Sequence, residues 1–153
     1  MNTLTVNTVI INRTRKEVYK FATNMENFKR WFPEVIEIES DNSLEHGIVE
    51  KKYTETVKIP LKGESKISLN VVKAKENMVF ITEGGFSPLL PRMIMKFSEE
   101  SSTTTILTWS MQSRNNNLIF KSLFLPIFKK IISKRAEVGI QNLKTILENE
   151  RLK

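Results

Sequence analysis

The last long stretch of the sequence decides the fold. Residues 118–149 read LIFKSLFLPIFKKIISKRAEVGIQNLKTILEN. Pro126 suits the first turn of a helix, and beyond it only Gly139 weakens a helical pattern. At 100° per residue, one side of this helix collects the apolar residues Ile132, Ala136, Ile140, Leu143 and Leu147. We therefore expect a long C-terminal helix whose apolar stripe packs against a sheet.

The first half of this stretch has more apolar surface than a sheet alone can cover. A second stripe, rotated by more than a quarter turn, contains Phe120, Phe124, Ile127 and Ile131, while Leu118, Leu125 and Phe128 continue the first stripe. A bound ligand, the short N-terminal helices, a membrane surface or a second subunit could provide the additional cover. The neighbouring basic residues are Lys129, Lys130, Lys134 and Arg135. Such a face suits anionic lipid or a phosphate backbone, although it is more often simply solvated.

Seven strands are expected ahead of this helix. Alternating β-branched and polar residues predict the first strand at Leu4–Ile11. The other six are predicted at residues 35–40, 48–59, 66–73, 78–83, 92–97 and 104–113, with short connections that include a turn at 42–47 and a hairpin at 60–63. Short turns between consecutive strands indicate an antiparallel meander.

Two short helices are expected between the first and second strands. Thr14 can cap the first helix, with Glu17 three residues later as its capping-box partner. The second helix carries Phe28, Trp31 and Phe32 on one side and stops at the following proline. This order of elements predicts one α+β domain over residues 1–153.

Composition excludes much catalytic chemistry. The 153 residues include no Cys, one His and one Asp, which argues against thiol nucleophiles, thiolate or multi-histidine metal sites and Asp-centred triads. The net charge of +7 favours anionic partners. No targeting segment is visible, and no apolar run reaches the ~20 residues that span a bilayer. We therefore expect a cytoplasmic protein.

Three segments resemble a known family. Residues 11–21, INRTRKEVYKF, join the end of a strand to a capped helix that carries Val, an aromatic residue and Phe. The sequence WFPEV at residues 31–35 places Trp shortly before Pro, and residues 143–148, LKTILE, look like the family's ending. In this order and spacing the whole chain resembles the START-related superfamily called SRPBCC, which includes polyketide cyclase/dehydrase-like proteins.

The resemblance implies a helix-grip fold. In that fold a curved antiparallel sheet of about seven strands wraps around a long C-terminal helix, with a hydrophobic-ligand cavity between them and usually no cofactor. It does not imply an enzyme, because many members only bind or carry a ligand. Arg13 and Arg15 stand where small residues or Pro are usual, and Asn24 stands where Asp is common. These departures leave the subfamily open.

Large apolar residues are the expected cavity lining on such a fold. The expected lining residues are Phe28, Trp31, Tyr53, Phe80, Trp109, Met111, Phe128 and Ile132. Trp31 and its neighbour Phe32 could lie at the cavity mouth or simply in the core. The loop at residues 84–91, GGFSPLLP, could be a lid, a membrane-touching tip or an ordinary packed loop.

Polar groups are also expected near this cavity. Lys51 and Glu55 share a strand face with Tyr53, and an inward orientation would place both in the cavity. There they could pair with each other, with Arg135 or with a polar group of the ligand. A twist or bulge could instead turn them to solvent. His46, in a turn, is expected to be exposed rather than catalytic.

The sequence therefore predicts binding or transport of a hydrophobic or amphipathic small molecule, such as a lipid, quinone, isoprenoid or polyketide-like compound. One alternative is a cyclase/dehydrase-type enzyme that uses Lys51, Tyr53 and Glu55 as polar cavity groups. The other is a basic interaction protein that acts on a ribosome, RNA or an anionic membrane. No recognition helix or RNA-binding aromatic signature is present, so nucleic acid is the less favoured partner. The expected oligomeric state is a monomer or weak homodimer.

Overall fold

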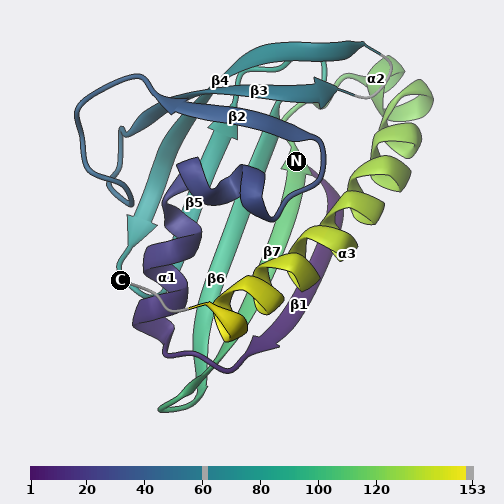
Figure 1. Ribbon diagram of the computed structural model, residues 1–153. Helices are drawn as coiled ribbons and strands as arrows, with labels where there is room; N and C mark the ends of the chain where they lie inside the picture. Colours follow the sequence, from purple (N-terminus) through teal and green to yellow (C-terminus); the bar gives the residue numbers. More distant parts are fainter. Residues whose placement is uncertain (60–61, 151–153) are drawn as a thin grey trace.

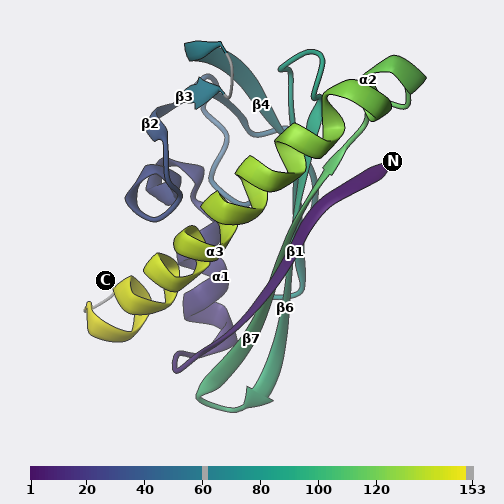
Figure 2. The same cartoon turned by 90° about the vertical axis from the view of Figure 1, so that its right-hand side faces the viewer.

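A computed structural model describes residues 1–59 and 62–150 of the chain. One curved antiparallel sheet has the order β1-β7-β6-β5-β4-β3-β2, and the helices cover its concave face (Figures 1 and 2). The strands are β1 (Asn2–Ile11), β2 (Val35–Ser40), β3 (Lys52–Ile59), β4 (Gly63–Lys75), β5 (Val79–Gly84), β6 (Pro91–Ser101) and β7 (Thr104–Ser113). The helices are α1 (Arg15–Thr23), the 3₁₀ helix η1 (Met25–Arg30), α2 (Leu118–Leu123) and α3 (Leu125–Asn149). The predicted helix-grip fold is confirmed.

Local capping signals act as the sequence predicted. The Thr14 hydroxyl accepts a hydrogen bond from the Glu17 amide at 3.2 Å, and the Glu17 carboxylate accepts one from the Thr14 amide at 3.4 Å, which completes the capping box of α1. The Asn24 side chain then accepts from the Glu26 amide at 3.0 Å and starts η1. These caps position η1 so that it crosses in front of the sheet (Figure 1).

One strand boundary differs from the prediction. The strand expected at residues 48–59 begins only at Lys52, because the chain turns at Glu50, whose φ is 75°. From there the predicted alternation holds, and Tyr53 and Glu55 face inward. The hairpin predicted at 60–63 lies partly outside the described residues.

The C-terminal helical region consists of two helices rather than one. The apolar stripe predicted from Ile132 to Leu147 is buried. Leu118 was predicted to continue this stripe and is instead 76% exposed. That prediction is wrong because the helix is interrupted at Phe124, so the 100° phase of α3 does not extend into α2. Phe120, Leu125 and Phe128 form a separate buried cluster with Leu4, Leu89 and Ile132.

Gly139 lets α3 approach the segment that follows η1. A Cβ atom at this position would lie 3.0 Å from Phe32 Cδ2 and 3.3 Å from the Trp31 carbonyl oxygen. Phe32 has little room to move, because its ring stacks on Phe28 at 4.8 Å. The Trp31 carbonyl is held by a 3.1 Å hydrogen bond from Asn142. The glycine that weakens the helix locally therefore serves its tertiary packing.

Substituting Gly139 tests this contact. We expect Gly139→Ala to lower the free energy of unfolding by about 1 kcal/mol, because the overpacking cost exceeds the gain in helix propensity. Gly139→Val should cost more. Urea unfolding followed by circular dichroism measures both, with Val138→Ala on the exposed side of α3 as the control. A stabilised Gly139→Ala protein would contradict the close contact.

Candidate functional site: a cavity between the sheet and the long helix

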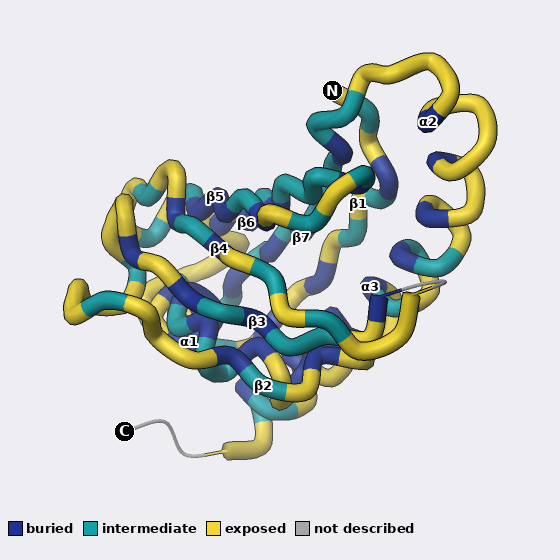
Figure 3. Tube along the Cα trace, turned by 90° about the horizontal axis from the view of Figure 1, so that it is seen from above, coloured by how far each residue is buried: buried dark blue, intermediate teal, exposed yellow. Residues whose placement is uncertain are grey.

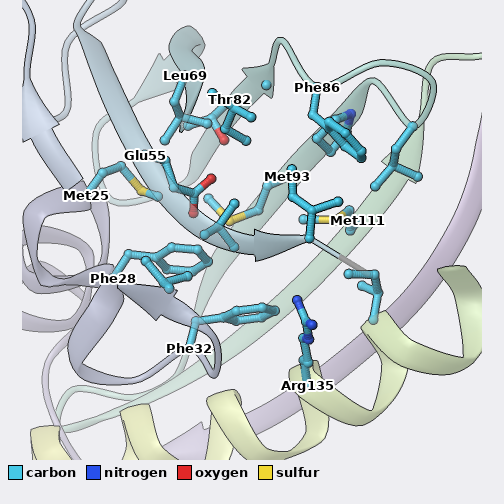
Figure 4. A pocket seen from close by; sticks show the side chains of 18 of the residues that line it. Met25, Phe28, Phe32, Glu55, Leu69, Thr82, Phe86, Met93, Met111 and Arg135 are labelled. Carbon is cyan, nitrogen blue, oxygen red and sulfur yellow. The ribbon is translucent and has the colours of Figure 1, made fainter. Parts of the chain in front are cut away.

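A cavity of about 80 Å³ lies between the concave face of the sheet and α3 (Figure 4). Its walls come from η1 and the segment after it, from strands β2 to β7, from the loop after β5 and from α3. Most lining side chains are apolar, and three of them are the methionines Met25, Met93 and Met111. The polar or charged side chains among them belong to Glu55, Lys58, Thr82 and Arg135.

The register of the strands decides which residues reach the cavity. Thr82 pairs with Met93, and Met93 pairs with Met111, so these three form one inward row across β5, β6 and β7. This row lines the cavity. The neighbouring inward row contains Phe80 and Trp109, and its space is filled, because Phe32 packs on Trp109 with ring centroids 5.1 Å apart.

Glu55 is the most unusual side chain in this cavity. It projects from β3 among apolar neighbours and is only 7% exposed (Figure 4). Within the described residues its carboxylate has neither a hydrogen bond nor an ion pair. Burial raises the pKa of Glu55 from 4.5 to about 7. A buried carboxyl that the protein does not satisfy can serve a bound molecule as hydrogen-bond donor or acceptor.

Two other polar groups flank the cavity. The side chain of Thr82 is buried and points into it, and its hydroxyl has no hydrogen-bond partner among the described residues (Figure 4). Arg135 projects from α3 on the opposite side from Glu55 (Figure 4). One Arg135 nitrogen donates to the Lys58 carbonyl at 2.8 Å, and burial lowers the pKa of this arginine. The cavity therefore has an apolar middle with polar groups on separate walls.

Five of the residues expected to line a cavity do so. These are Phe28, Met111, Ile132, Glu55 and Arg135. Six others do not line this cavity, namely Trp31, Tyr53, Phe80, Trp109, Phe128 and Lys51. All six are buried, because each fills space elsewhere in the core or at its edge.

Lys51 and Tyr53 belong to a different polar cluster. The Lys51 ammonium donates to the Asn42 carbonyl at 2.8 Å and does not pair with Glu55. The Tyr53 hydroxyl lies 2.6 Å from His46 Nδ1, and His46 Nε2 lies 3.2 Å from the Glu26 carboxylate. Burial raises the pKa of Tyr53 to about 12. This chain of contacts ties the 41–50 loop to η1 and β3.

Several lining residues were not among the expected ones. Met25 and Thr82 lie on elements of six residues, and Met93 lies near the start of β6, so their inward side is visible only once the strands are registered. The loop at 84–91 turns out to be a cavity wall, with Leu89 buried beneath α2 and α3 and Phe86 beside it. The alternation of inward and outward residues along β5 and β6 could have identified these side chains as inward. It does not show whether other side chains fill the space over a row of inward residues or leave a cavity there.

Other site types find no support in the described residues. Over 1–59 and 62–150 there is no group of three or more His, Asp or Glu side chains that could hold a metal ion. None of the helices there is both long and apolar enough to cross a membrane.

Comparisons with known proteins agree with the fold. No family model matches the sequence, and no curated protein matches it. A START superfamily protein from Mycobacterium smegmatis superposes with a TM-score of 0.75 at 14% identity, covering 94% of this chain and 96% of that one. A Thermobifida fusca protein gives 0.72 at 13% identity, with 99% of both chains covered. The di-domain ARO/CYC protein BexL of the BE-7585A biosynthetic pathway gives 0.66 at 14% identity, covering 97% of this chain and 50% of that one.

These likenesses define the class of fold. The chain has the START-like helix-grip fold, as its resemblance to the START-related superfamily implied. At these identities the likenesses show the fold alone, and any ligand must be argued from the cavity of this chain.

The buried carboxyl predicts a pH-dependent stability. Between pH 4.5 and about 7 the unfolded chain loses the Glu55 proton while the folded protein keeps it, so the cost of burying this group grows as the pH rises. We expect Glu55→Gln to stabilise the protein by about 3 kcal/mol at pH 8 and by little at pH 4.5.

Urea unfolding at the two pH values measures this difference. Glu64→Gln, at an exposed position of β4, removes the same charge and is the control. A Glu55→Gln effect that is equal at both pH values would show that the carboxyl is not buried as described.

Proposed function

We propose that this protein binds a hydrophobic or amphipathic small molecule, such as a lipid, quinone, isoprenoid or polyketide-like compound, in the cavity between the sheet and α3. The observation that carries the proposal is the Glu55 carboxyl in an apolar cavity, where it has no partner among the described residues. A protein that only needed a stable core would gain from an apolar residue there, because burying an unpaired polar group costs about 1–3 kcal/mol.

The size of the cavity indicates how a ligand enters. Small-molecule sites typically measure about 300–1,000 Å³, whereas this cavity has about 80 Å³. A ligand of ordinary size must therefore displace side chains, and Met25, Met93 and Met111 are suited to this because methionine is flexible. Affinity then comes from burial of apolar area at ~25 cal/mol per Å².

The polar groups orient the ligand. A carbonyl, hydroxyl or amine of the ligand would meet Glu55 and Thr82, and an anionic or carbonyl group at the other end would meet Arg135. The ligand class that fits is an apolar body with a polar group at one or both ends.

The proposal predicts ligand-dependent stabilisation. Protein purified without detergent is analysed by native mass spectrometry and solvent extraction, and the melting temperature is measured with a panel of fatty acids, quinones, isoprenoids and aromatic polyketides. We expect a co-purifying or added apolar molecule to raise the melting temperature.

Val57→Phe, which fills the cavity, should weaken binding at least tenfold. The same substitution at Val72, which is exposed on β4, should not.

Two outcomes would count against this proposal. One is that no compound binds and nothing is extracted. The other is that Val57→Phe and Val72→Phe bind equally well, which would place the ligand outside the cavity.

A second candidate function is acid–base catalysis of the cyclase/dehydrase type. Its support is Glu55, whose pKa of about 7 suits proton transfer at neutral pH. Lys51 and Tyr53, which the sequence suggested as partners, lie outside the cavity, so Glu55 is the acid–base group that the proposal retains. If a polyketide from the binding panel is converted, Glu55→Gln should abolish turnover while leaving the binding of the polyketide within about threefold. Turnover that survives Glu55→Gln would remove this candidate.

A further inference from the structure

The molecule has an exposed apolar tip where α2 meets α3. The apolar tip comprises Leu118, Ile119, Leu123, Phe124 and Ile127. Leu118, Ile119 and Leu123 are 76%, 67% and 62% exposed, and among the large apolar residues of the described chain only Met1, also at 62%, reaches the same range. Seen from above, this end of the helices projects away from the rest of the protein (Figure 3).

The fold does not require this exposure. The opposite side of the same two helices is already anchored, because Phe120, Leu125 and Phe128 pack against Leu4 and Leu89. Asn117 caps α2 through hydrogen bonds from the Ile119 and Phe120 amides. These contacts would hold the helices equally well with polar residues on the outer side. Clustered apolar exposure that does not serve the fold indicates an interaction surface.

The charges around the tip have one sign. Lys121, Lys129, Lys130 and Lys134 are exposed, and none of them has an ion pair within the described residues. No acidic residue occurs between Arg114 and Glu137. Some basic groups elsewhere are paired, as Lys29 is with Glu37 at 2.8 Å and Arg92 is with Glu83 at 2.7 Å. The tip therefore presents apolar side chains beside uncompensated positive charge.

We propose that the apolar tip docks the protein onto an anionic bilayer surface. The apolar side chains enter the interface between headgroups and acyl chains, and the lysines contact lipid phosphates. A nucleic acid would satisfy the lysines but leave the apolar side chains in water. A second copy of the chain would cover the apolar side chains but bring the unpaired lysines of both copies together. An anionic membrane matches both features.

This surface adds to the proposed ligand site without depending on it. Ile132 and Arg135, which line the cavity, lie on α3 one to two turns beyond Ile127, so docking would hold the cavity close to the lipid. Docking itself is measurable on protein without ligand, and its failure would leave the ligand proposal untouched.

Vesicle flotation tests the docking. We expect binding to vesicles of 70:30 phosphatidylcholine:phosphatidylglycerol at 50 mM salt, at least tenfold weaker binding at 500 mM salt, and little binding to pure phosphatidylcholine. Absence of binding to the anionic vesicles at low salt would overturn the proposal.

Matched variants separate the tip from general basicity. Lys129→Gln/Lys130→Gln/Lys134→Gln should weaken binding about 100-fold, since each lysine near an anionic surface changes the constant about fivefold. Lys66→Gln/Lys73→Gln/Lys75→Gln, which removes the same charge from exposed positions of β4, should have much less effect. Equal losses in both triple variants would overturn the proposal, because binding would then follow net charge alone.

The apolar contribution has its own readout. The chain has no Cys, so Leu123→Cys can be labelled uniquely with an environment-sensitive fluorophore. Its emission should shift to the blue with anionic vesicles, whereas the label at Val138→Cys, exposed further along α3, should not respond. Two results would overturn membrane docking by the tip. One is that the fluorescence of the Leu123 label does not change with anionic vesicles. The other is that the protein self-associates with rising concentration, and that Leu118→Ser/Ile119→Ser/Leu123→Ser abolishes this self-association while vesicle binding persists.

Discussion

The packing of α3 across the concave face of the sheet is the contact on which the rest of the structure depends. The buried residues Ala136, Ile140, Leu143 and Leu147 supply the helix side of the main core, and Gly139 lets the helix lie against the Phe32 ring and the Trp31 carbonyl. A sheet with one apolar face must be covered, and this single long helix, together with the segment that η1 presents, covers most of it.

The cavity exists because α3 and η1 fill the space over the concave face of the sheet unevenly. Aromatic rings from η1 and the residues after it occupy the space over the row that contains Phe80 and Trp109. Over the next row, with Thr82, Met93 and Met111, the rings of Phe28, Phe32 and Phe86 line the space without filling it, and a cavity remains. Glu55 projects into that opening from β3, where nothing in the described chain neutralises it. The packing of α3 thus completes the core and leaves a cavity in which the Glu55 carboxyl has no partner among the described residues.

Charge and apolar surface are arranged in complementary ways at the two proposed sites. Inside the cavity a carboxyl is surrounded by apolar side chains, so desolvation controls its proton. At the apolar tip, exposed lysines lie beside exposed apolar side chains. The attraction of these lysines for an anionic surface is screened by salt, because they lie in solvent. The interruption at Phe124 connects the two, since it turns α2 outward while α3 keeps Ile132 and Arg135 at the cavity.

Periodicity along the chain was sufficient to predict the seven strands, the capping box at Thr14 and the buried stripe of α3, because these depend on neighbours within a few residues. It placed Glu55 on the same strand face as Tyr53 but left open whether that face points inward or a twist turns it to solvent. It could not predict that Trp109 packs under Phe32 while Met111 lines an opening, or that Lys51 bonds to Asn42 rather than to Glu55. Those outcomes depend on strand register, sheet curvature and the approach of α3 to η1, which join residues up to about a hundred positions apart and exist only in the folded chain.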